Sequence, residues 1–181
     1  MKDRKDAGLA LARACVAIDD RFPARAGPRT VWTTGRIVLD PGAPSIIPGR
    51  AEMLFQVRDD EPEIVEQLEA LLQEIASEIG GLTGCSVEIT RLRTGNPAVM
   101  NTGFQHAIQQ AASMFAGGKS ISMPSGAGHD AQVLATIMPA GMLFVPSIGG
   151  ISHHWTENTD DADIVMGAEV FVETCRRLLA I

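Results

Sequence analysis

The chain has 181 residues, of which 45% are hydrophobic and 20% are charged, a composition typical of a globular protein rather than a disordered one. Its 15 Lys and Arg residues against 22 Asp and Glu give a formal net charge of −7, which argues against a nucleic-acid-binding face because phosphate contacts need clustered positive charge. With two Trp, six Phe and no Tyr, the chain is not expected to form a base-stacking platform either.

Three widely spaced cysteines, Cys15, Cys85 and Cys175, lie within apolar patterns. This arrangement predicts core thiols of a cytoplasmic protein rather than a disulfide framework. Arg13 interrupts the one apolar stretch near the N-terminus, so no signal peptide is predicted. The uncharged run at residues 131–152 contains two prolines and three glycines, which favours a buried strand with loops over a membrane-spanning helix.

The first half of the chain has the pattern of helix, strand, strand, helix and strand. Residues 51–58 alternate, with Met53 and Phe55 on the apolar face and Arg58 on the other, as in a half-buried strand. Apolar residues then recur at helical spacing from Ile64 to Ile79. We predict a helix over residues 6–19, strands over 30–40 and 51–58, a helix capped by Asp60 and ended by Gly80-Gly81, and a strand over 85–92.

A break around Gly95 and Pro97 separates a second α/β segment from the first. There we predict a helix over residues 104–115 that stops at Gly117-Gly118, a tight loop at 125–128, a short helix from Asp130, a buried strand over 142–145 and a final helix. The apolar face of the final helix carries Ile164, Val165, Ala168, Phe171, Val172, Cys175, Leu178 and Leu179.

The order of elements in the first half is ferredoxin-like with its opening strand absent, within an overall α/β (α+β) class. A sheet that lacks a strand exposes a pairing edge, which favours association with a second copy, so we expect a homodimer. The second segment is too small to be expected to fold stably as a domain by itself.

Two segments combine histidine and carboxylate with small residues in loops, where α/β proteins build sites: residues 123–131 and 149–157. In the first, Gly126 and Gly128 allow backbone N–H groups to approach an anion or a developing oxyanion closely. In the second, His153 is a candidate metal ligand because a neutral imidazole suits zinc and similar ions.

Each of these residues also has a plainer interpretation. The pair His129-Asp130 is equally explained as a cap of the following helix. His153 and His154 fit a surface loop, Glu157 fits a solvated or capping carboxylate, and Trp155 fits a packing residue. Arg58 fits an exposed strand residue paired with Glu52 or Asp59. No spacing here forms a complete zinc motif.

The stretch Ser125-Gly-Ala-Gly-His-Asp-Ala131, followed by Phe144-Val-Pro-Ser147 and Gly149-Gly-Ile-Ser-His153, closely resembles the C-terminal signature of the hydantoinase/carbamoylase amidases. That family includes N-carbamoyl-L-amino acid hydrolases, β-ureidopropionases and allantoate amidohydrolases. The resemblance extends back through residues 35–42 and 47–49 to Arg58, and on into the last helix, so it covers nearly the whole chain.

The resemblance implies a catalytic domain that is split in sequence by an inserted dimerisation (lid) domain. Residues 1–94 then correspond to an incomplete ferredoxin-like lid domain, and residues 95–181 to the C-terminal segment of a dimetal-hydrolase catalytic domain. It further implies that His153 binds a divalent metal, zinc or manganese, and that Arg58 binds a substrate carboxylate, which a guanidinium fits bidentately. The other residues implied to contact an N-carbamoyl or ureido substrate are Ser45, Gly126, Ala127, Gly128 and His129.

The chain departs from the family pattern in two ways. Ser45 stands where the family usually has a substrate-binding asparagine, and Gln56 replaces an acid commonly found two residues before the arginine. The family's other metal ligands and its general-base glutamate lie in an N-terminal lobe that is not among these 181 residues. One histidine does not hold a catalytic metal, which takes about three protein ligands.

Two functions remain open. The first is a metal-dependent hydrolase of linear amide C–N bonds that is inactive as these 181 residues alone. The alternative is a non-enzymatic dimerisation or interaction module derived from the same family. A related dimetal aminoacylase or peptidase fits the motif at residues 125–131 less well.

Overall fold

The structure, a computed structural model, describes residues 1 and 3–179, and the chain divides into two compact units, Met1–Pro97 and Ala98–Ile181. Each unit is described by itself. Both mix helices with extended segments, and the described part of the chain forms one two-stranded sheet, in the first unit. The mixed α/β class predicted from the sequence is confirmed.

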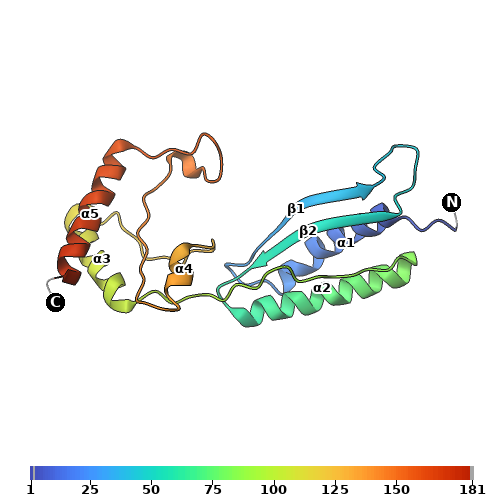
Figure 1. The fold of residues 1–181 in the computed structure, drawn as a ribbon, viewed down its shortest axis with the longest axis horizontal. Coiled ribbons are helices and arrows are strands. Elements are labelled where there is room, and N and C mark those ends of the chain that lie inside the picture. The colour runs from blue at the N-terminus through green and yellow to red at the C-terminus, as the bar shows by residue number, and fades with distance from the viewer. Residues whose placement is uncertain (2, 180–181) are drawn as a thin grey trace. The chain divides into compact units, whose positions relative to one another are not determined.

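The first unit contains two helices and an antiparallel β-hairpin (Figure 1). Helix α1 (Ala7–Arg21) begins where the side chain of Asp6 accepts a hydrogen bond from the Leu9 N–H, an ordinary N-cap. A short 3₁₀ turn (Phe22–Ala24) follows. Strands β1 (Val31–Asp40) and β2 (Arg50–Arg58) then pair, and helix α2 (Pro62–Thr83) completes the unit.

The hairpin register runs from Val31 opposite Arg58 to Asp40 opposite Arg50, with a β-bulge between Thr34 and Arg36. The two strands match the predicted ranges to within one residue at each end. Because side chains alternate across a strand, the apolar side chains of β2 turn together towards the helices, as predicted.

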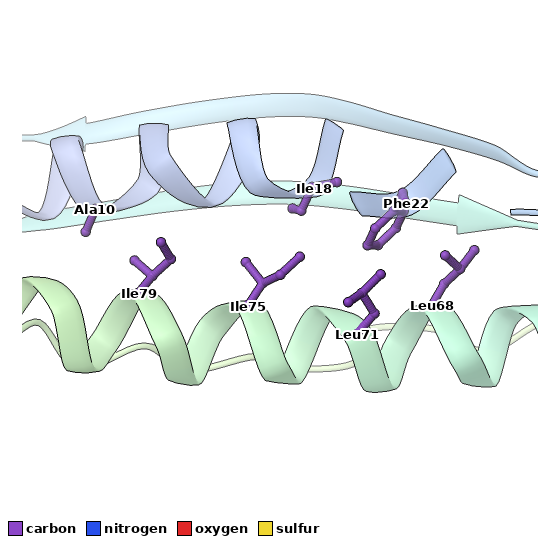
Figure 2. Close-up of a cluster of buried hydrophobic side chains, with 7 residues drawn as sticks. All are labelled: Ala10, Ile18, Phe22, Leu68, Leu71, Ile75 and Ile79. Carbon is purple, nitrogen blue, oxygen red and sulfur yellow. The ribbon is translucent and has the colours of Figure 1, made fainter. Parts of the chain in front are cut away.

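The hydrophobic core of this unit lies between α1, α2 and the face of β2. Figure 2 shows its buried members, with Ala10, Ile18 and Phe22 opposing the apolar stripe of α2, namely Leu68, Leu71, Ile75 and Ile79. The Phe22 ring lies edge-on to the rings of both Trp32 and Phe55, with centroids 5.7 Å apart in each pair. The helical stripe predicted from the sequence is therefore confirmed.

Helix α2 begins and ends at residues other than those predicted. Glu61 rather than Asp60 occupies the N-cap position, and its side chain makes no capping hydrogen bond. The helix continues through Gly80 and Gly81 and ends when Gly84 enters the left-handed region at φ 68°, where its N–H bonds to the carbonyl of Gly80 at 2.9 Å. Glycine tolerates a helix interior at a modest cost, so the left-handed cap, not the glycine pair, ends the helix.

The strand predicted over residues 85–92 is wrong. No residue of this segment pairs with a strand in the described chain, and the sheet holds β1 and β2 alone there. Instead the chain turns back along α2 (Figure 1), where Arg91 forms an ion pair with Glu69. An alternating sequence forms a strand only when a partner supplies the ladder of hydrogen bonds. The helix–strand–strand–helix unit observed thus has one strand fewer than the predicted order.

In the second unit, helices α3 (Thr102–Phe115) and α5 (Asp161–Leu179) pack against each other. Asn101 caps α3 by accepting the Phe104 N–H at 3.0 Å. Gly117 and Gly118 follow the end of the helix, as predicted, and both have positive φ. Helix α4 (Asp130–Leu134) is a single short helix, and a 3₁₀ turn (Ile148–Gly150) precedes the loop to α5. The buried core is small and consists of Ala111, Ala112 and Val170, with Ile108 and Leu143 packed against it.

Three expectations for this unit are wrong. The segment 142–145 forms no strand, again because the described residues supply no partner strand. The predicted apolar face of α5 is largely exposed, with Val165 59% and Phe171 60% accessible, while Val170 and Thr174 are the buried positions. Trp155, interpreted as a packing residue, is 88% exposed.

The three cysteines are free and half-buried. None of the helices formed by residues 3–179 combines the length and the apolarity needed to cross a bilayer.

Candidate functional site

The loop at residues 125–131 holds His129 in a defined orientation. The Oγ atom of Ser125 lies 2.6 Å from Nε2 of His129, and the Ala127 N–H donates to the same Oγ at 3.3 Å. The imidazole also lies against the ring of Phe144, with centroids 5.4 Å apart. The structure therefore brings together the Ser125–Ala131 motif and the start of the Phe144–Ser147 motif.

His129 occupies the N-cap position of α4, but its side chain makes no capping hydrogen bond. His129 therefore takes the cap position that the capping interpretation gives it, with Asp130 in the first turn, but its ring has no part in the cap. The ring is instead bound to Ser125, and both side chains are half-buried. A histidine held at one ring nitrogen by a hydroxyl is suited to exchange a hydrogen bond with a polar ligand through the rest of its ring.

The two glycines of this loop are not required by packing within the chain. A Cβ atom built on Gly126 or on Gly128 meets nothing within 4 Å, and neither residue has a positive φ. Gly126, Ala127 and Gly128 are all exposed. Within the described residues neither sterics nor backbone conformation demands glycine here, and two glycines leave room for a ligand to approach this backbone closely.

His153 lies in an exposed loop whose ends are joined by a hydrogen bond from the Ile148 N–H to the Asn158 carbonyl, at 2.8 Å. Gly149 and Gly150, at φ 67° and 70°, both take the left-handed conformation, which requires glycine at the turn into this loop. The His153 N–H donates to Oε2 of Glu157 at 2.8 Å. The neighbouring His154 differs, because its Nδ1 lies 2.8 Å from the hydroxyl of Thr156.

Arg58 is the last residue of β2 and is half-buried. The chain around it is fixed by Asp59, which accepts hydrogen bonds from the Thr30 hydroxyl and from the Glu61 N–H at 2.9 Å. Partial burial raises the pKa of Asp59, but the hydrogen bonds from Thr30, Glu61 and Asp60 together lower this pKa by more, so it lies below its ordinary value. The carboxylate therefore stays charged and holds the segment that follows Arg58.

Ser45 lies at the other end of the hairpin from Arg58. It is an exposed residue of the connection between β1 and β2, which precedes Arg50, whereas Arg58 ends β2. A nine-residue strand spans roughly 25 Å, so the two side chains do not meet at one small ligand within this unit. Glu52, one candidate partner of Arg58, accepts hydrogen bonds from Arg36 at 2.7 Å and from Arg50 at 3.0 Å.

The residues present do not make a complete metal centre. Among residues 1 and 3–179, no group of three or more His, Cys, Asp and Glu side chains is placed to hold a metal ion. A catalytic zinc takes about three protein ligands and an open position. His153 alone does not meet that requirement.

Comparison with known proteins decides the family. Residues 2–177 match the sequence profile of peptidase family M20/M25/M40. The chain belongs to this family. Hydrolases of the M20 family generally depend on divalent metals.

Amidohydrolases are prominent among the M20 relatives. The chain is 32% identical over 178 residues to the N-carbamoyl-L-amino acid amidohydrolase of Geobacillus stearothermophilus, covering 98% of this chain and 43% of the relative. It is 31% identical over 149 residues to the allantoate amidohydrolase of Bacillus subtilis, covering 81% of this chain and 35% of the relative. The resemblance to amidases inferred from the motifs is thus confirmed.

A solved structure supports the same grouping. The amidase of the hydantoinase/carbamoylase family from Burkholderia phymatum aligns with a TM-score of 0.84 and 41% identity, over 98% of this chain and 43% of that one. The chain therefore spans about two fifths of the length of this structure and of the Geobacillus relative.

Two contacts of the site are not predicted by the sequence. Ser125 lies within the motif without an assigned role, and Glu157 fits a solvated or capping carboxylate without a named partner. Ser125 precedes His129 by four residues and Glu157 follows His153 by four, and this spacing is the one signal in the sequence for the two contacts. In an irregular loop such spacing predicts no contact, so only the folded backbone reveals either pair.

Proposed function

We propose that this chain is part of a hydrolase of linear amide C–N bonds that acts on N-carbamoyl or ureido substrates. The observation that carries the proposal is the Ser125–Ala131 loop, in which His129 is held by Ser125. At Gly126 and Gly128 of this loop, an added Cβ atom would meet no atom of the described residues within 4 Å. The amidohydrolases among its relatives support the class of reaction.

In this proposal the two units have different tasks. Residues 1–94 form a dimerisation (lid) domain, and residues 95–181 form the C-terminal segment of a catalytic domain. Arg58 at the end of β2 binds the substrate carboxylate, for which a guanidinium offers two parallel N–H donors. Ser45, across the hairpin, contacts substrate at a separate point or from a second copy of the chain.

The Gly126–Gly128 backbone and the His129 side chain face the bond that is cleaved. Attack on an amide carbonyl places negative charge on its oxygen, which N–H groups held in advance stabilise more than they stabilise the ground state. Ser125 keeps His129 in place for this task. A divalent ion, zinc or manganese, belongs to the proposal with His153 as its ligand from this chain, and the remaining ligands lie outside these 181 residues.

The 181-residue chain alone is expected to be inactive. One histidine among the described residues does not form a complete ligand set, so we expect no hydrolysis of N-carbamoyl amino acids with added Mn²⁺ or Zn²⁺. Turnover by the purified chain that disappears in His153→Ala would overturn this expectation.

A chimera tests the proposed reaction directly. In it, this chain replaces the matching 43% of the Geobacillus amidohydrolase. We expect hydrolysis of N-carbamoyl-L-amino acids, and we expect Arg58→Ala to raise KM by about 10- to 100-fold through loss of a charge-assisted hydrogen bond. Arg50→Ala, at the start of the same strand, is the matched control. A folded chimera without turnover, or equal effects of the two substitutions, would refute the assignment.

The second candidate is a dimerisation or interaction module without enzymatic activity. Both outer edges of the described two-stranded sheet lack a partner strand, and β1 exposes Ile37, Val38 and Leu39, each at least 41% accessible. Light scattering after gel filtration measures the oligomeric state. A dimer that Val38→Lys dissociates, with Leu82→Lys on α2 as control, together with an inactive chimera, would favour this candidate.

A further inference from the structure

His153 has an unusual backbone conformation. Its φ of 57° makes it the one non-glycine residue with positive φ among residues 1 and 3–179. Such a conformation is uncommon for a residue with a Cβ atom and persists only where surrounding interactions hold it. The loop must therefore contain an interaction that holds this residue in place.

Two hydrogen bonds made by Glu157, one to His153 and one to His154, provide that interaction. The Glu157 carboxylate accepts the His153 N–H at 2.8 Å, and the Glu157 N–H donates to the carbonyl of His154 at 2.9 Å. The backbone N–H of Glu157 thus closes the turn from His154, and its carboxylate binds the residue just before that turn. A bond from N–H to a charged carboxylate is stronger than one to a neutral acceptor.

The contact acts on the main chain of His153 and not on its ring. The backbone angles φ and ψ set the direction of the Cα–Cβ bond, so the hydrogen bond to the N–H also sets the direction of the side chain. Neither ring nitrogen takes part in this hydrogen bond. The adjacent His154 is the opposite case, since its ring is bound through Nδ1 to Thr156. The ring of His154 is therefore hydrogen-bonded within the loop, whereas at His153 the hydrogen bond is made by the backbone.

We infer that Glu157 is the positioning residue for His153. Its carboxylate holds the left-handed backbone at that position and so sets the direction in which the imidazole leaves the loop. What the imidazole then binds rests on the proposed function, but the positioning itself does not. Glu157 is accordingly a residue that acts through His153 rather than on a substrate.

Nuclear magnetic resonance of the 181-residue chain tests the inference without any metal or turnover. The intraresidue contact between HN and Hα of His153 is strong at positive φ, and hydrogen exchange of its N–H reports the bond to Glu157. We expect Glu157→Ala to speed this exchange by at least about 10-fold and to weaken the HN–Hα contact. Glu157→Gln keeps an acceptor oxygen at the same reach and is expected to retain both signals.

Two further variants complete the test. Glu157→Asp keeps the charge but shortens the side chain by one methylene, and we expect it to behave like Glu157→Ala. Glu169→Ala, an exposed glutamate of α5, is the matched control and should change neither signal.

Two results would overturn the inference. One is an extended backbone at His153 in the unsubstituted chain, a measurement that does not depend on any variant folding. The other is unchanged hydrogen exchange of the His153 N–H in both Glu157→Ala and Glu157→Asp. The proposed function fails by a different result, namely a folded chimera without turnover.

Discussion

The hydroxyl of Ser125 and the imidazole of His129 lie 2.6 Å apart, from Oγ to Nε2. Since the Ala127 N–H also donates to that hydroxyl at 3.3 Å, Ser125 joins the backbone of the glycine loop to the histidine that follows it. The loop and the ring therefore have one common anchor, and disturbing that anchor should move both.

The Ser125→Ala substitution is expected to release the His129 ring. The cost in the free energy of unfolding should be about 1 kcal/mol, the usual value for one hydrogen bond. The imidazole ¹⁵N resonances of His129 should shift, and hydrolysis by the chimera should fall. Ser122→Ala, an exposed serine of the same segment, is the control. Unchanged His129 resonances in Ser125→Ala would contradict the anchoring role.

The Gly126→Ala substitution distinguishes an effect on stability from an effect on ligand binding. A Cβ atom at this position meets nothing within 4 Å, so the free energy of unfolding should change by less than about 0.5 kcal/mol. Hydrolysis by the chimera should nevertheless fall, because the new methyl group occupies the space that a ligand needs. Gly141→Ala gives the opposite pattern, since its Cβ would lie 3.1 Å from Cβ of Phe104 and should destabilise the fold by about 1–3 kcal/mol. A stable and fully active Gly126→Ala chimera would remove the argument for ligand approach.

The end of α2 provides a prediction for stability alone. Gly84→Ala should cost about 1 kcal/mol, because alanine is strained at φ 68°. Gly81→Ala, three residues earlier within the helix, should stabilise by up to about 1 kcal/mol, since a Cβ there meets nothing within 4 Å. Urea denaturation of the two variants measures both effects, and the same sign for both would show that the left-handed cap is not what ends the helix.

Acid should weaken the segment that follows Arg58. The pKa of Asp59 is lower in the folded chain than its ordinary value of about 3.9, so its charge stabilises the fold above that pH. That contribution is lost as the pH falls through the lower, folded-state pKa. Asp59→Asn should therefore be less stable than the unsubstituted chain at neutral pH, with a difference that shrinks in acid. Denaturation at a series of pH values measures this difference. Asp20→Asn, an exposed carboxylate of α1, controls for loss of charge, and a difference that grows in acid would contradict the prediction.

The sequence by itself determined the elements whose signal is local. The apolar stripe of α2, the alternation of β2 and the glycines after α3 depend on periodicity or on backbone freedom within a few residues, and each is present in the structure. The motifs around His129 and His153 identified the family for the same reason, because they are contiguous runs of residues.

The tertiary structure decided whatever depends on a partner. Residues 85–92 alternate and residues 142–145 form a short apolar run, and both patterns predict strands. A strand exists only where a second strand supplies its hydrogen bonds, and none does so in the described residues. The apolar face of α5 reads as buried, but burial needs an opposing surface, and Phe171 remains 60% exposed. The pairs Ser125–His129 and His153–Glu157 likewise arise from loop backbones whose path no periodicity predicts.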